Sequence, residues 1–100
     1  MTWGFAFFLT VACEAPLAAT AAPAAGRARA ACDSALFNLT THPLAWLAVT
    51  RGLLPWAAVE LTVFTFEALA YAYVTRLGLQ RGAAVSALAN GCTAALSWAL

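Results

Sequence analysis

The 100-residue chain has few charged side chains, and this shortage excludes most classes of soluble protein. Charged residues make up 9% of the sequence, lysine is absent, and hydrophobic residues make up 64%. A soluble domain carries about a quarter charged residues to cover its surface. The net charge of +1 also excludes a basic nucleic-acid-binding protein. With a mean hydropathy of +0.82, the chain is expected to be an integral membrane protein in a lipid bilayer.

Cysteine motifs and catalytic motifs are also missing. The three cysteines (Cys13, Cys32 and Cys92) have no Cys-x-x-Cys spacing, and their odd number does not fit a disulfide framework. We interpret them as small packing residues. The sequence contains no Ser/His/Asp or Cys/His catalytic motif and no glycine-rich phosphate loop, and the stretches between its hydrophobic segments are short. We therefore expect that the protein is not an enzyme.

Proline, glycine and arginine divide the chain into four hydrophobic segments of about 20 residues, the length of a membrane-crossing helix. The first is not expected to be a cleaved signal peptide, because no positive residue precedes it and Glu14 interrupts it. A turn is predicted at residues 76–82. The predicted fold is all-α, a single transmembrane domain over residues 1–100 with four spans at about 3–22, 30–49, 56–75 and 83–100.

Arginine and tryptophan sort to opposite ends of these spans. Two of the three turns hold four arginines (Arg27, Arg29, Arg76 and Arg81), whereas the third holds only Arg51. The tryptophans lie at the other end of their spans (Trp3, Trp46, Trp56 and Trp98). Positive charge marks cytoplasmic turns, and tryptophan marks a membrane interface. The expected location is the bacterial inner membrane, with the arginine-rich turns in the cytoplasm and both termini outside.

An internal repeat is the most specific signal in the sequence. Residues 29–46 align with residues 81–98, and nine of these eighteen positions are identical. The preceding spans also correspond, because Glu14 follows Trp3, and Glu67 follows Trp56, by 11 residues each. We predict two tandem, parallel helical-hairpin repeats, at about 3–49 and 56–100, related by an axis along the membrane normal.

The repeat places four polar residues near the middle of the bilayer: Glu14, Asn38, Glu67 and Asn90. The glutamates lie about 16 Å, and the asparagines about 12 Å, from the tryptophans of their spans at helical rise. In the last span, Asn90 belongs to a polar stripe with helical spacing, Ser86, Asn90, Thr93 and Ser97. We expect these polar faces to meet inside the protein. A second face of small residues suits close helix approach: Ala87, Gly91, Ala95 and Ala99.

Two ionisable residues interrupt the repeat at equal depth. His42 stands where the second unit has Ala94, and Glu60 stands where the first unit has Phe7. We expect a His42–Glu60 hydrogen bond; a metal site at these two residues stays open. Ligation of a chlorophyll or haem by His42 is a weaker alternative, and the sequence identifies no cofactor.

The chain resembles a family of small, uncharacterised bacterial membrane proteins with several spans. The resemblance rests on Glu14-Ala-Pro16, on Asn38-Leu-Thr-Thr-His42-Pro43, on the paired Glu60 and Glu67, and on Ser86 with Asn90. It implies the four-span architecture and the same polar residues, and it implies no activity.

Two functions stay open at this point. The leading hypothesis is a structural or accessory subunit of a larger membrane complex, such as a respiratory or photosynthetic one. Four short, alanine-rich helices make a thin core and leave much apolar surface for other membrane subunits. The alternative is a small proton, cation or metal transporter that works as a homo-oligomer and uses the midplane carboxylates.

Overall fold

Four α-helices account for nearly the whole chain. The computed structural model describes the backbone of residues 2–99 and, apart from residues 97 and 98, their side chains. The elements are α1 (Trp3–Ala21), a short 3₁₀ turn (Ala24–Gly26), α2 (Arg27–Thr50), α3 (Trp56–Tyr73) and α4 (Leu79–Ala99). The described residues contain no strand. The all-α prediction with four helices is confirmed, whereas the predicted side-chain positions of Ser97 and Trp98 lie outside the described residues.

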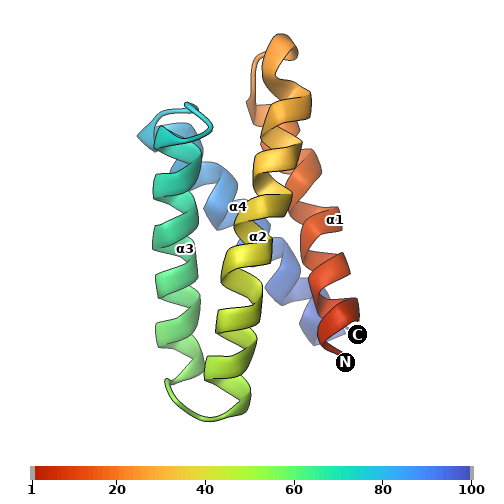
Figure 1. Cartoon of the computed structure of the whole chain (residues 1–100), viewed down its shortest axis with the longest axis vertical. Helices are drawn as coiled ribbons and strands as arrows, with labels where there is room; N and C mark the ends of the chain where they lie inside the picture. Colours follow the sequence, from red (N-terminus) through yellow and green to blue (C-terminus); the bar gives the residue numbers. More distant parts are fainter. Residues whose placement is uncertain (1, 100) are drawn as a thin grey trace.

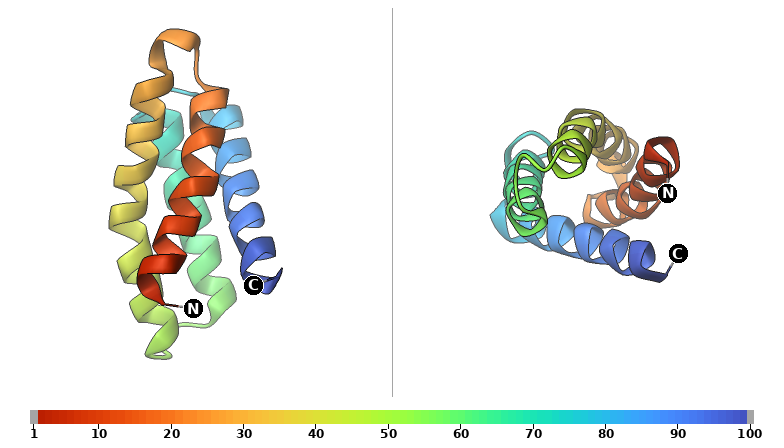
Figure 2. Two further views of the ribbon diagram at one scale, coloured as in Figure 1. Left: turned by 90° about the vertical axis from the view of Figure 1, so that its right-hand side faces the viewer. Right: turned by 90° about the horizontal axis from the view of Figure 1, so that it is seen from below.

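The helices run up and down in turn, so that each packs beside its neighbours in the chain and α4 also packs beside α1 (Figure 1). The bundle measures 40 × 22 × 20 Å. The turns at residues 22–26 and 74–78 lie at one end, and the 51–55 turn lies at the other, near both termini (Figures 1 and 2). We call these the arginine end, which carries Arg27, Arg29, Arg76 and Arg81, and the tryptophan end, which carries Trp3, Trp46 and Trp56.

The turn before α4 is shorter than predicted. Helix α4 begins at Leu79, not near Ala83. The turn is therefore formed by residues 74–78, in place of the expected 76–82. Arg76 and Gly78 both adopt a left-handed backbone, with φ of 63° and 86°, and this reverses the chain within a few residues. The backbone N–H groups of Leu77 and Gly78 donate to carbonyls of α3, and so bind the turn to the helix end. Helix α2 likewise begins earlier than predicted, at Arg27.

Small residues let the helices approach closely. Ala18, Ala30 and Ala89 are fully buried, and Tyr71 is the largest fully buried side chain. At Gly82, a Cβ atom would lie 2.6 Å from the Ala68 carbonyl oxygen of α3. Gly82, which the sequence suggests as a turn residue, is therefore the point where α4 touches the α3 backbone.

Only α1, among the described helices, is long and apolar enough to pass a membrane-span test on length and composition. A core helix of a soluble protein and an N-terminal signal sequence pass the same test, so this result alone is weak evidence. The glutamates of α3 and the charged first turns of α2 and α4 lower the mean hydropathy of those helices.

We predict that Gly82→Ala lowers the stability of the bundle by about 1–3 kcal/mol, because overpacking at a backbone contact forces the helices apart. Unfolding of the detergent-solubilised protein, followed by circular dichroism, measures the change. Gly91→Ala is the matched control, because its added Cβ atom meets nothing within 4 Å. Equal stability of the two variants would contradict the α3–α4 contact.

Candidate functional site

Polar side chains occupy the centre of the bundle, and apolar side chains cover its outside. In α1, the buried face repeats every four residues and includes Thr10 and Glu14. Glu14, Ser34, Glu67 and Ser86 are at most 1% exposed, and Asn38 is 2% exposed. Asn90 and Thr93 are half-buried. Glu14, Asn38, Glu67 and Asn90 thus face inward, and the predicted stripe is internal as far as it is described.

Glu14 of α1 is held by a residue that sequence reasoning did not select. The Tyr71 hydroxyl group of α3 donates a hydrogen bond of 2.5 Å to Glu14 Oε1. Tyr71 lies one helical turn after Glu67, so both residues share the buried face of α3. Its ring packs edge-on against Phe37 of α2, at a centroid distance of 5.2 Å. Tyr71 therefore joins α1, α2 and α3 at one point.

Glu67 of α3 is held by α4. Asn90 Nδ2 donates to Glu67 Oε1 at 3.1 Å and to the Ser86 carbonyl at 2.8 Å. Ser86 Oγ donates to the Phe64 carbonyl oxygen at 2.9 Å. Glu67 thus takes its donor from Asn90, whereas Glu14 uses Tyr71 and not Asn38.

The two carboxyl groups also lie near one another at the buried centre of the bundle. Glu67 Oε2 has no donor among the described residues. Two carboxylates are acceptors only, so a bond between them requires one proton. Like charges at this separation also repel strongly inside a protein. The geometry therefore fits a carboxyl pair that shares one proton.

Asn38 occupies the place in α2 that Asn90 occupies in α4. Its Nδ2 donates to the Ser34 carbonyl at 2.9 Å, the same intrahelical bond that Asn90 makes with Ser86. Because a carbonyl can only accept, this contact assigns Nδ2 in both asparagines. The amide oxygen Oδ1 of each is left free to accept another hydrogen bond.

A cavity of about 620 Å³ lies in the tryptophan half of the bundle and is lined by all four helices. Asn38 and Asn90 line its inner part, and Asn90 also holds Glu67. Trp46, Thr50 and Trp56 line it near the 51–55 turn. The cavity therefore extends from the tryptophan end as far as Asn90, which holds Glu67, although neither Glu14 nor Glu67 lines it.

His42 lies in the cavity wall among aromatic rings. Phe7 and Trp3 meet its ring edge-on at centroid distances of 5.6 and 5.8 Å, and Trp46 stacks on it at 6.2 Å. His42 Nδ1 is buried and bonds to no described residue. The aromatic rings hold the imidazole by packing and leave its Nδ1 atom available for a hydrogen bond with a ligand.

Glu60 lines the same cavity, but the expected His42–Glu60 hydrogen bond is wrong, since no described contact joins the two. Phe7, and not Glu60, packs against the imidazole. Within residues 2–99, no group of three or more histidine, cysteine, aspartate or glutamate side chains could hold a metal ion. A metal at His42 and Glu60 would need hydroxyl, amide or water ligands.

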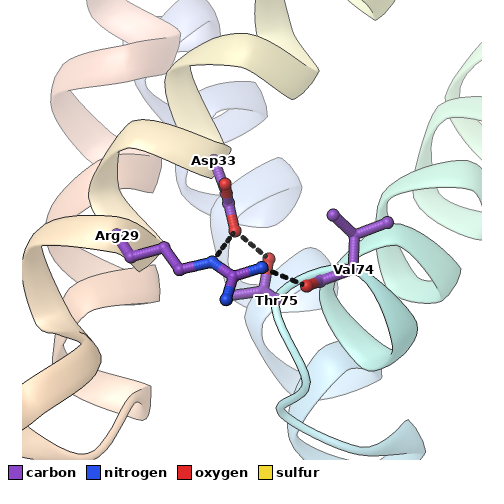
Figure 3. Close-up of polar contacts among 4 residues, drawn as sticks. All are labelled: Arg29, Asp33, Val74 and Thr75. Atoms are coloured by element: carbon purple, nitrogen blue, oxygen red, sulfur yellow. Dashed lines mark hydrogen bonds and ion pairs between the residues drawn. The ribbon is translucent and has the colours of Figure 1, made fainter.

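Polar contacts join two helices at the arginine end. Arg29 Nε forms an ion pair with Asp33 Oδ2 at 3.7 Å, and Thr75 Oγ1 donates to the same oxygen at 3.0 Å (Figure 3). Arg29 also donates to the Val74 carbonyl at 3.0 Å. These contacts bind the start of α2 to the end of α3. Small and apolar side chains pack at this end, including Ala22, Ala30 and Leu77, and a hollow of about 700 Å³ lies beside Ala22 and Arg81.

The cysteines are free thiols, as the sequence indicates. Cys13 is partly buried in α1, whereas Cys32 and Cys92 are exposed.

Comparisons of the chain with protein-family models, with curated proteins and with solved structures find no match.

We predict that Tyr71→Phe destabilises the bundle by about 1–2 kcal/mol, because the buried Glu14 carboxyl loses its donor. The midpoint of unfolding during titration with a denaturing detergent measures the loss. Tyr73→Phe is the matched control, because Tyr73 is 66% exposed and should not affect the midpoint. Indistinguishable midpoints would show that the Tyr71 hydroxyl does not support Glu14.

Proposed function

We propose that the chain is a four-span protein of the bacterial inner membrane. Its polarity is inverted relative to a soluble protein, since the buried side chains include two glutamates while Phe8, Leu61 and Leu88 are more than 60% exposed. All exposed charged side chains among the described residues are arginines at the two ends of the bundle. The 40 Å length of the bundle matches the bilayer core of about 30 Å with part of its interfaces.

Exposed threonines support the same proposal. Each of the five exposed helical threonines donates its hydroxyl hydrogen to the carbonyl oxygen four residues earlier: Thr20, Thr40, Thr50, Thr62 and Thr65. A hydroxyl group in hydrocarbon has no water to bond, so an internal acceptor is required there. These side chains are therefore compatible with contact to lipid.

The placement of arginine supports an orientation with the arginine end in the cytoplasm and both termini outside. Arg27, Arg29 and Arg81 occupy the first turns of α2 and α4. Positive charge is unfavourable at a helix N-terminus because of the helix dipole. Helix stability therefore does not account for these arginines, whereas the preference for positive cytoplasmic turns does.

We expect alkaline phosphatase inserted after Gly52 to be active, because the enzyme forms its disulfides only outside the cytoplasm. The same insertion after Gly78 should be inactive. Both glycines lie in turns between helices, so the two insertions are matched, and phosphatase activity in whole cells is the measurement. The opposite pattern would reverse the orientation, and equal activity at both sites would contradict the four-span topology.

The function that the geometry supports best is transport of protons or small cations through the bundle, with Glu14 and Glu67 as the exchanging groups. The observation that carries this proposal is a cavity in the tryptophan half that reaches Asn90, the residue that donates to the buried Glu67 carboxyl. Ionisable residues inside a membrane bundle mark proton and ion pathways. A shared proton between two carboxyls can be lost to a cation or to water and regained.

The contacts at the arginine end fit this function. Arg29, Asp33 and Thr75 join α2 to the end of α3 there, and a transporter with alternating access would break such contacts to open that end. Glu14 and Glu67 do not line the cavity, so exchange between the cavity and the carboxyl pair would pass through Asn90.

The burial pattern supports the tandem repeat. Ala6, Glu14 and Ala18 of α1 are buried, and so are Val59, Glu67 and Tyr71, 53 residues later. Ala30 and Ser34 are buried, and so are Gly82 and Ser86, 52 residues later. The two halves therefore contribute one carboxyl and one asparagine each to a shared centre.

We predict that purified protein in liposomes conducts protons under an imposed membrane potential, and that Glu67→Gln lowers the flux at least about tenfold, because the amide carries no exchangeable acid group. A pH-sensitive dye inside the vesicles measures the flux. Glu67→Asp is the matched variant that keeps a titratable group, and it should retain flux. Unchanged flux in Glu67→Gln, with unaltered helix content, would reject this role.

The accessory-subunit hypothesis remains the second candidate, and one observation favours it. Ala87, Gly91, Ala95 and Ala99 of α4 are all exposed, so the small-residue face does not pack within this chain. Small residues four apart allow close approach of another membrane helix. An accessory subunit requires a partner chain on α4 and predicts no proton flux. The liposome experiment therefore distinguishes it from a transporter.

A further inference from the structure

The chemistry of the cavity in the tryptophan half indicates what it binds. Its volume of about 620 Å³ lies in the range of small-molecule sites, about 300–1,000 Å³. It is far larger than a bare metal ion requires. Valine and alanine side chains form much of its wall, including Val59, Val63 and Ala94. A ligand that fills this space needs an apolar body.

The charge of the cavity favours a cation. Glu60 is the carboxyl group in its lining, and it accepts no hydrogen bond from any residue that the structure describes. None of the five arginines lines the cavity. His42 is the other ionisable group there. An anionic ligand would meet Glu60 without a guanidinium partner, whereas a cation would neutralise it.

The Glu60 carboxyl and the two asparagine Oδ1 atoms of the cavity can accept hydrogen bonds, and no described residue donates one to them. Asn38 and Asn90 use their Nδ2 groups on helix carbonyls, so their Oδ1 atoms remain as acceptors in the lining that also contains Glu60. Trp46 and Trp56 line the same cavity near the 51–55 turn. Tryptophan rings attract organic cations through the charge distribution of the ring.

We propose that this cavity binds a protonated organic amine, with its ammonium group on Glu60 and the asparagine Oδ1 atoms and its apolar body against the valines and tryptophans. This inference rests on the proposed transport function and names its substrate class as organic ammonium ions. The binding step needs no flux, so it can be tested apart from transport.

The test is calorimetric titration of the detergent-purified full chain with 2-phenylethylammonium, with tryptophan fluorescence as a second readout. The neutral analogue 2-phenylethanol has the same apolar body without the charge. We expect the ammonium ion to bind at least about tenfold more tightly than the alcohol, and Glu60→Gln to remove this difference, since charge-assisted hydrogen bonds are the strong ones. Asp33→Asn is the matched control, because Asp33 does not line the cavity.

Equal binding of the ammonium ion and the alcohol by the unaltered protein would overturn the proposal, and this comparison requires no variant to fold. Ammonium binding by Glu60→Gln that equals binding by the unaltered protein would also overturn it. Tight binding of zinc chloride that depends on both Glu60 and His42, without ammonium binding, would assign the site to a metal. Selective ammonium binding without proton flux would support the ligand class and reject proton transport by Glu14 and Glu67.

Discussion

Hydrogen bonding of two buried carboxyl groups is the constraint on which the rest of the structure depends. An acid at the centre of a helix bundle is costly unless donors surround it. Glu14 takes its donor from Tyr71 across the bundle, and Glu67 takes its donor from Asn90 of the adjacent helix. These bonds require α1, α3 and α4 to approach closely, and Gly82 allows the approach of α3 and α4 because it has no Cβ atom. The small residues of the core are therefore a consequence of its polar centre.

The same constraint explains why the apolar residues lie outside. A polar centre with a small-residue shell leaves no room for most of the leucines and phenylalanines, which consequently cover the surface. In water such a surface would cost about 25 cal/mol for each Å² of exposed apolar area. In lipid this cost is absent, and helix association depends instead on close packing and interhelical hydrogen bonds. The interactions that hold this bundle together are of those two kinds, which makes the fold and its proposed solvent consistent.

Much of the fold follows from the sequence because local signals fix it. The lengths of the hydrophobic segments, and the prolines, glycines and arginines between them, predict four helices. The spacing of residues within these segments places Glu14, Asn38 and Glu67 on inward faces.

Features that depend on packing between helices were not predictable from the sequence. The Tyr71–Glu14 bond joins helices that are not neighbours in the chain, and the early start of α4 depends on the left-handed backbone at Arg76. The expected His42–Glu60 bond is wrong because Phe7 packs against the imidazole. The cavity arises from small side chains on four helices together.

The asymmetry of the site lies where the two halves of the sequence differ. Ala18 and Tyr71 are equivalent positions, and both are fully buried, but only the tyrosine reaches across the bundle to a carboxyl group. Phe7 and Glu60 are also equivalent; the phenylalanine packs on His42, whereas the glutamate lines the cavity. The positions that the two halves share supply two carboxyls and two asparagines, but only Asn90 bonds to a glutamate, whereas Asn38 bonds within its own helix. The replacements around these positions make the difference. Tyr71 gives Glu14 a donor from another helix, and Glu60 gives the cavity a carboxyl group that Phe7 could not supply, so Glu14 and Glu67 have different partners in an otherwise repeated arrangement.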